Sequence, residues 1–299
     1  MKGNIRSWKR EAKQVLKGKY SKAIWAIIAV NVLSMLGSNL VVSLFTGNTL
    51  IEQILTKVVS FTVSLILCVF TAGLSYMYLN MSREKSYSYR DLLYFFKNHP
   101  DRVIIAGFVM EIINEIAFIP YYYVVYTNDF GIITTMEEYA EYITLVSGLT
   151  VVGMLLNLLL TLPLLQVYYL QADDLELGGM EALKQSARLM KGHKFKYILM
   201  ELSFLPWMLL ASVMLTVGIW GVAIGVSILT LLTVGSTIII FWLMPYMKMT
   251  EVFFYRALIN DKENSEYDEN RMSRTAEIQS WSEWRNEQTP ETDDENTEA

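Results

Sequence analysis

Three carboxylates lie within long apolar stretches of this sequence, where an ionised side chain is expensive to bury. Glu111 and Glu115 are one helical turn apart with Asn114 beside them, and Glu201 lies in a later apolar stretch. A charge in hydrocarbon costs at least ~2.5 kcal/mol, so such groups turn toward a protein interior and indicate a functional role. These residues predict a buried acidic cavity that can hold a cation, a proton or an amine-bearing headgroup.

A structural role for the acids is the alternative. At about 1.5 Å per residue, Glu111 lies about 12 Å into its predicted helix and Glu201 about 9 Å into its own, so the two should share a depth and face each other. They could instead form ion pairs with Lys194, Lys196 or Arg102, or the helices could begin later and leave the acids at the interface. The sequence leaves both interpretations open.

Basic residues share one face of a predicted amphipathic helix at residues 179–192, and apolar residues recur at helical spacing on another face. The pattern predicts a helix that lies on a membrane surface. The basic side chains of this helix and of the cluster just after it are candidates for contact with anionic lipid headgroups: Lys184, Arg188, Lys191 and Lys194. Residues 4–18 repeat the pattern and predict a second interfacial helix.

Acidic residues dominate the C-terminal stretch 260–299, where 13 Asp and Glu stand against 4 Lys and Arg. Aliphatic residues are scarce there, so we expect the stretch to be mostly disordered. Trp281 and Trp284 lie close to one helical face and are candidates for docking a membrane or cytoplasmic protein partner. A transient helix without a partner fits the same pattern.

Sequence signatures of catalysis, metal binding and nucleotide binding are missing. The two histidines, His99 and His193, form no HExxH pair, and there is neither a GxxxxGK[ST] loop nor a GxSxG turn. The single cysteine, Cys68, excludes an intramolecular disulfide. We therefore expect no enzyme, no cofactor, no metal site and no nucleic-acid partner.

Apolar segments must position these residues. Of the 299 residues 53% are hydrophobic, and the mean hydropathy is +0.30. Segments long enough to span a bilayer occur at 22–45, 54–80, 103–126, 143–170, 195–217 and 223–247. The predicted fold is all-α, a polytopic membrane bundle of about six transmembrane helices with amphipathic surface helices, in which Pro163 and Pro206 kink the fourth and fifth helices. Its predicted divisions are a basic helix at 1–20, the bundle at 21–259 and the acidic tail at 260–299.

Basic residues also predict the orientation of the bundle. With the N-terminus inside, the cytoplasmic segments hold 24 of the 25 Lys and Arg, and only Lys57 lies on the external side. We expect a multi-pass protein of the cytoplasmic membrane with both termini in the cytoplasm. The amphipathic helices would then lie on the cytoplasmic side.

The two long cytoplasmic loops resemble each other. Tyr78-Leu79 to Leu92 and Tyr169-Leu170 to Leu183 keep the same spacing at an offset of 91 residues. This similarity predicts that helices 2 to 3 and helices 4 to 5 are equivalent units. Such repeats occur in membrane proteins with and without transport activity.

Two stretches, EALKQSARLMKGHK followed by ELSFLPW at 181–207 and PYMKMTEVFFYRAL at 245–258, resemble the bacterial integral membrane family of domain of unknown function 975. Arg6, Ala12-Lys13 and LKGKYSKAI extend the resemblance to the N-terminus. It implies a polytopic protein mainly of Gram-positive bacteria, distantly similar to the membrane region before some glycerophosphodiester phosphodiesterases, with no established activity. The link between LSFLPW and PYMKMT is longer than the family pattern, and no catalytic residue carries over.

Two functions fit these patterns. The first is a non-catalytic integral membrane protein that binds membrane lipids or a partner protein, supported by the basic helices and the acidic tail. The alternative is a small secondary transporter or lipid-moving protein that uses the buried glutamates. The feature that separates them is whether Glu111, Glu115 and Glu201 converge on one hydrated cavity.

Overall fold

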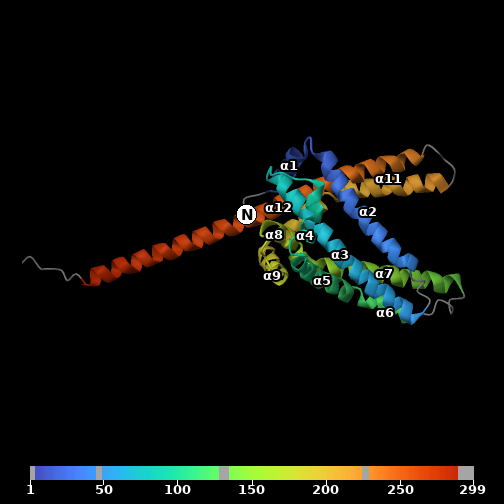
Figure 1. Cartoon of the computed structure of the whole chain (residues 1–299), viewed down its shortest axis with the longest axis horizontal. Coiled ribbons are helices and arrows are strands. Elements are labelled where there is room, and N and C mark those ends of the chain that lie inside the picture. The colour runs from blue at the N-terminus through green and yellow to red at the C-terminus, as the bar shows by residue number, and fades with distance from the viewer. Residues whose placement is uncertain (1–3, 45–48, 128–134, 224–228, 289–299) are drawn as a thin grey trace, which may run out of the picture. The chain divides into compact units, whose positions relative to one another are not determined.

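The computed structural model describes residues 4–44, 49–127, 135–223 and 229–288, which are mostly helical and contain no strand (Figure 1). The elements in chain order are α1 (Ile5–Leu16), α2 (Tyr20–Leu44), α3 (Leu50–Ser82), η1 (Tyr89–Leu93), α4 (Tyr94–Lys97), α5 (Pro100–Ala117), α6 (Ile119–Thr127), α7 (Met136–Thr161), η3 (Leu162–Leu164), α8 (Val167–Asp173), α9 (Gly179–Leu189), α10 (Lys194–Leu202), α11 (Leu205–Ala223) and α12 (Thr230–Gln288). The all-α prediction is confirmed.

Among the described residues, four helices are long and apolar enough to cross a membrane, and two bent helix pairs raise the number to six if each pair is one span. The pairs are α5 with α6, bent by 54°, and α10 with α11, bent by 41°. Each of the six predicted spans overlaps one of these helices or pairs. A polytopic helical membrane protein follows from the length and composition of these helices.

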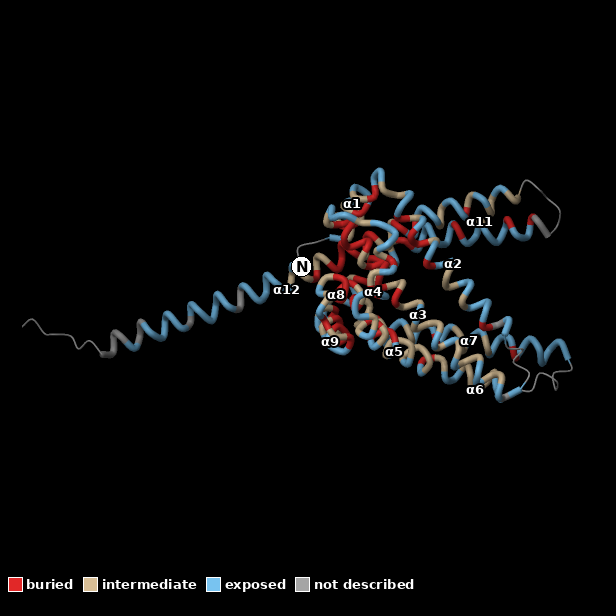
Figure 2. Tube along the Cα trace, in the orientation of Figure 1, coloured by how far each residue is buried: buried red, intermediate tan, exposed pale blue. Residues whose placement is uncertain are grey.

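Large apolar side chains cover the outside of the long helices. On α7 and α11, for example, Leu159 is 62% exposed and Trp220 is 67% exposed. Figure 2 shows the buried residues gathered around α1, α4 and α8, while α2, α7 and α11 are largely exposed along their lengths. Soluble monomers rarely expose apolar patches of this extent, whereas a bilayer accepts them.

Three of the spans are interrupted, each beside a proline. Pro120 lies in the first turn of α6, Pro163 lies in η3 between α7 and α8, and Pro206 lies in the first turn of α11. Proline has no backbone N–H and its ring clashes with the preceding turn, so a helix bends or breaks there. The predicted interruptions at Pro163 and Pro206 are confirmed, and the break beside Pro120 adds a third.

The two amphipathic helices turn much of their apolar faces toward the protein, and whether they also lie on a membrane surface stays a prediction. On α1, Trp8, Ala12 and Leu16 are buried, and the Trp8 ring meets the Phe254 ring edge to face at 5.3 Å. On α9 the buried residues are Gly179, Ala182, Leu183 and Ser186. The 3.6-residue period that sequence analysis detects is the same for a helix packed on protein and one packed on lipid.

The C-terminal helix α12 runs on to Gln288, through most of the stretch that the composition predicts to be disordered. No proline or glycine interrupts residues 246–288, and Lys262 and Glu266 form an i,i+4 pair at 3.6 Å, so local interactions favour the helix. The described residues up to Tyr255 form one compact unit, and the part of α12 from Arg256 onward belongs to a second. Residues 289–299 of the predicted tail lie outside the described residues.

Candidate functional site

A polar cavity of about 360 Å³ lies between α3, α5 and the α7–α8 break. We call it the Glu111 pocket. Its lining residues are Ser64 and Cys68 of α3, Gly107, Met110, Glu111 and Asn114 of α5, Asn157 and Thr161 of α7, and Tyr168 of α8. Two of the predicted cluster residues, Glu111 and Asn114, therefore share a cavity, and its other polar groups come from helices distant in the sequence.

Helical spacing on α5 brings its lining residues to one face. Gly107, Glu111 and Asn114 follow each other at intervals of four and three residues, which keeps them aligned along the helix. Gly107 faces Cys68, and a Cβ atom at that position would clash with the Cys68 Sγ. The missing side chain lets α3 and α5 approach closely at the pocket.

The break at Pro163 shapes the other wall of the pocket. Thr161 and Tyr168 lie on either side of η3, so the interruption turns both toward the cavity. Ser186 of α9 satisfies backbone groups at the break, because its hydroxyl donates to the Pro163 carbonyl at 2.8 Å and accepts from the Gln166 N–H at 3.2 Å. A side chain from α9 thus replaces backbone hydrogen bonds lost at the break.

The described pocket lining includes a buried amide oxygen that no protein donor satisfies. Asn157 donates its amide to Asn114 Oδ1 at 3.1 Å, and its own buried Oδ1 has no hydrogen-bond partner in the part of the chain that the structure describes. Thr161 donates its hydroxyl to the Asn157 carbonyl at 2.7 Å. Ser64 lies within hydrogen-bonding reach of Glu111 but also 2.9 Å from the Phe61 carbonyl, and it has only one proton to donate. The pocket suits a ligand that donates hydrogen bonds.

Glu115 lies one turn beyond Glu111 and already pairs with a lysine side chain. The Lys57 ammonium of α3 is 3.3 Å from both carboxylate oxygens of Glu115, and it also lies 3.6 Å from the centre of the Tyr122 ring. A carboxylate and an aromatic face are both good partners for an ammonium group. Lys57, rather than Lys194, Lys196 or Arg102, is therefore the base that pairs with this acid.

Glu201 belongs to a different polar cluster, which corrects the expectation that it faces Glu111. Its charged neighbours are Lys9 of α1 and Lys248 and Glu251 of α12. Lys9 also donates to the Ser203 carbonyl at 3.1 Å, beside the break between α10 and α11. Burial lowers the pKa of the Lys9 ammonium from its usual value, and the nearby Glu201 carboxylate opposes that shift. Counting residues along a helix does not determine which neighbour a side chain meets.

Glu251 is held on several sides by protein donors. Lys248 donates to it at 3.0 Å, Tyr169 at 3.1 Å and Tyr197 at 3.4 Å. Both tyrosines are buried, and Tyr169 stacks on Tyr255 with ring centroids 5.5 Å apart. Since its acceptors are satisfied by the protein, this cluster is suited to holding α8, α10 and α12 together.

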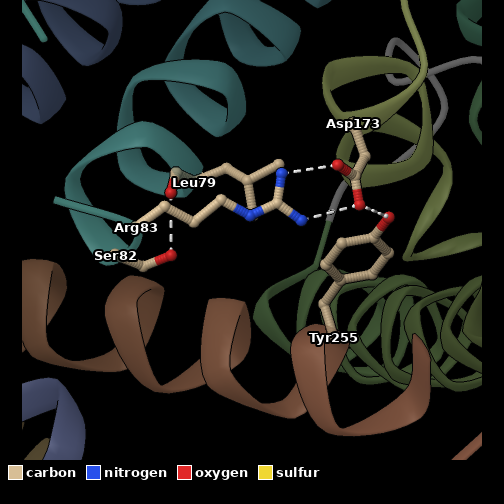
Figure 3. Close-up of polar contacts among 5 residues, drawn as sticks. All are labelled: Leu79, Ser82, Arg83, Asp173 and Tyr255. Atoms are coloured by element: carbon tan, nitrogen blue, oxygen red, sulfur yellow. Dashed lines mark hydrogen bonds and ion pairs between the residues drawn. The ribbon is translucent and has the colours of Figure 1, made fainter. Parts of the chain in front are cut away.

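A third polar group joins α3, α8 and α12 (Figure 3). Arg83 donates to both oxygens of Asp173, at 2.5 and 2.9 Å, and the Tyr255 hydroxyl donates to the same carboxylate at 3.0 Å. No sequence pattern described above predicted this group. The repeat offers a signal for it, because the same alignment sets Arg83 and the acidic pair Asp173 and Asp174 at equivalent helix ends.

The proposed lipid-contacting and partner-docking residues are accessible. The basic side chains of α9, of the turn after it and of the first residue of α10 are all exposed: Lys184, Arg188, Lys191 and Lys194. On α12, Trp281 is 59% and Trp284 is 52% exposed, and their rings meet edge to face at 5.9 Å. Within the described ranges no group of three or more His, Cys, Asp or Glu side chains is arranged to hold a metal ion.

Comparison with known proteins yields one family. The model of the family described as "Protein of unknown function (DUF975)" matches residues 1–262. No curated protein and no solved structure matches the chain.

Proposed function

Since this chain belongs to the DUF975 family, whose description states no function, we propose a function from its own residues. It is a non-catalytic integral membrane protein that binds a cation-bearing ligand in the Glu111 pocket. We also propose that it resides in the cytoplasmic membrane with both termini inside, which the distribution of Lys and Arg supports.

One observation carries this proposal: a carboxylate and an unsatisfied acceptor line the same open pocket between α3, α5 and the α7–α8 break. Glu111 and Asn157 Oδ1, which has no hydrogen-bond partner among the described residues, line the same space. Lys57 of α3 is hydrogen-bonded to Glu115, one turn from Glu111. An unpaired buried acceptor costs about 1–3 kcal/mol, which a donating ligand would recover. The volume also matches the smaller ligand pockets of proteins, which start near ~300 Å³.

Thermal unfolding of the purified full chain with a panel of cations tests the proposal. The panel contains sodium, potassium, ammonium and alkylammonium chlorides at matched ionic strength. A bound cation at ten times its Kd would stabilise the protein by about 1.4 kcal/mol and raise the Tm. Glu111→Gln should abolish that rise, whereas Glu137→Gln, at an exposed carboxylate in the first turn of α7, should keep it. If no cation in the panel raises the Tm of the wild type, the proposed function is wrong.

The three glutamates do not converge on one cavity, since Glu111 alone of them lines the pocket. Transport is still the second candidate, because the pocket adjoins broken helices. Asn114 lies next to the break between α5 and α6, and Thr161 and Tyr168 flank the break in η3. Transporters bind substrates and ions where discontinuous helices meet near the bilayer midplane. Uptake of the cation that binds best into sealed proteoliposomes separates the two functions, since a transporter loads the vesicles and a binding protein does not.

Binding of anionic lipid is a third activity that we propose for the exposed basic residues of α9, of the turn after it and of the start of α10. Each Lys or Arg near an anionic surface contributes about 1 kcal/mol. Changing Lys184, Arg188, Lys191 and Lys194 to Gln should reduce the anionic lipid that co-purifies with the protein, measured by mass spectrometry. Changing the exposed Lys262, Arg271 and Arg274 of α12 to Gln provides the control, and equal loss in both variants would argue against a specific surface.

A further inference from the structure

The hydrogen-bonding groups of the Glu111 pocket define the class of its ligand more narrowly than the charge of Glu111 does. The inference drawn from them rests on the proposed cation-binding function. We propose that the pocket binds the primary ammonium group of an amphipathic molecule. Such a group occurs on aminolipid headgroups and on free lipophilic amines, and both present the same three N–H donors.

The acceptors of the pocket match those donors. Glu111 supplies a carboxylate from α5, and Asn157 of α7 supplies a buried Oδ1 that has no partner in the described part of the chain. Asn114 Oδ1 accepts one hydrogen bond from Asn157 and, as an amide oxygen, has a second lone pair. An ammonium group carries three donors and no acceptor, so it can satisfy these oxygens while its charge offsets that of Glu111.

The lining disfavours the other common cations. Quaternary ammonium groups lack N–H donors and are recognised by several aromatic faces, yet among the described lining residues Tyr168 is the only aromatic. Its hydroxyl is engaged in a hydrogen bond with Cys68. Calcium and magnesium ions need about six or more oxygen ligands, and the lining supplies a single carboxylate. A hydrogen-bonding ammonium fits this set of groups better than either.

The protein already binds a primary ammonium on the same face of α5. Lys57 places its ammonium against both oxygens of Glu115, one turn from Glu111. That ammonium is tethered to α3, and its charge is also felt by Glu111. In the pocket, Glu111 likewise places a carboxylate on α5 facing α3. No lysine is among the described lining residues, so this carboxylate has no tethered ammonium there.

The position of the pocket favours a ligand with an apolar body. Glu111 lies about 16 Å along α5, near the middle of a hydrocarbon core of about 30 Å. The neighbouring outward residues Phe108, Ile112 and Leu158 are exposed on the apolar surface. A hydrocarbon tail can rest on that surface while the ammonium enters the pocket, which a small hydrophilic amine cannot do.

Competitive binding to the full chain in phosphatidylcholine nanodiscs tests the inference. The probes are octylamine, trimethyloctylammonium, ethanolamine and phosphatidylethanolamine, with thermal unfolding and native mass spectrometry as readouts. We expect octylamine to bind at least tenfold more tightly than trimethyloctylammonium and ethanolamine. Retention of phosphatidylethanolamine over phosphatidylcholine would identify a lipid as the source of the ammonium, and retention of octylamine alone would identify a free amine.

Two variants with opposite expected effects on octylamine affinity distinguish loss of binding from loss of folding. Glu111→Gln should lower octylamine affinity at least tenfold, and Asn157→Asp, which adds a second carboxylate to the pocket, should raise it. Equal or tighter Glu111-dependent binding of trimethyloctylammonium or of alkali cations would overturn the primary-ammonium inference and leave the cation-binding function standing. Failure of every cation to bind would overturn both. An Asn157→Asp protein that folds but binds octylamine no better than wild type would also count against the inference.

Discussion

Arg83 and Asp173 show at the scale of single residues how this bundle joins distant helices. The two parallel hydrogen bonds between them need both side chains in one plane, and the Tyr255 hydroxyl fixes the carboxylate from a third helix. Their side chains are 28% and 23% exposed, so water screens the pair only in part. A planar guanidinium satisfies this geometry and a lysine does not.

Breaking this group should destabilise the protein. We expect Asp173→Asn to lower the free energy of unfolding by about 2 kcal/mol and Tyr255→Phe by about 1 kcal/mol, because charged hydrogen bonds are the stronger ones. Arg83→Lys should fall between wild type and Asp173→Asn. The measurement is the thermal unfolding midpoint in detergent, with Glu176→Gln as control, since Glu176 pairs with Arg102 but is 80% exposed. An Asp173→Asn protein as stable as the control would show that the pair contributes little.

Substitutions in the Lys57–Glu115 pair should change the free energy of unfolding non-additively. Lys57→Met leaves the Glu115 charge without its partner and should cost about 1 kcal/mol or more, since the pair is only partly buried. Combining it with Glu115→Gln removes both charges and should recover most of that loss. Unfolding of the single and double variants in the same detergent checks this. A double variant less stable than Lys57→Met would contradict it.

At the scale of elements, the proline breaks are held by side chains from neighbouring helices. Ser186 of α9 bridges Pro163 and Gln166 at one break, and Lys9 of α1 donates to Ser203 at another. A backbone group freed inside a membrane protein must find such a partner, because lipid offers none. The short helices α1 and α9 therefore stabilise the broken spans that they contact.

Ser186→Ala should show how much the Ser186 hydroxyl stabilises the break at Pro163. It leaves the Pro163 carbonyl and the Gln166 N–H without their hydroxyl partner, so we expect a loss of about 1–3 kcal/mol in unfolding free energy. Ser212→Ala is the matched control, because the Ser212 hydroxyl is exposed and donates to Leu209 in its own helix. The two should differ clearly in thermal unfolding midpoint. Equal stability would mean that the break is supported by other contacts.

At the scale of the whole molecule, orientation rests on the uneven distribution of basic residues. Single cysteines at Asn128 and Asn264, introduced into a Cys68→Ser background, should react differently with an impermeant thiol reagent added to intact cells. Residue 128, which lies outside the described residues, should be labelled, and residue 264 on α12 should not. Labelling at 264 would reverse the proposed topology.

The tail beyond the compact unit should be dispensable for the bundle. The described residues to Tyr255 form a unit of their own, so deletion of residues 265–299 should leave membrane insertion and the thermal unfolding midpoint unchanged. Changing Trp281 and Trp284 to Ala should weaken capture of a protein partner in a pull-down, because these two exposed rings are the apolar surface that the partner would cover. A truncated protein that unfolds early would show that the tail supports the fold.

Properties carried by the local sequence were predictable. The apolar spans follow from runs of hydrophobic residues, and the breaks at Pro163 and Pro206 follow from the missing N–H of proline. Glu111 and Asn114 could be placed in one site because they lie on one face of one helix.

The tertiary structure alone decided which residues meet. It brought Asn157 and Tyr168 to Glu111, paired Glu115 with Lys57, and set Glu201 in another cluster. Hydropathy and residue counting give the depth of a side chain along its helix. The neighbour of that side chain depends on the rotation of each helix about its axis and on the breaks that redirect it, which are set by close packing between helices distant in the sequence.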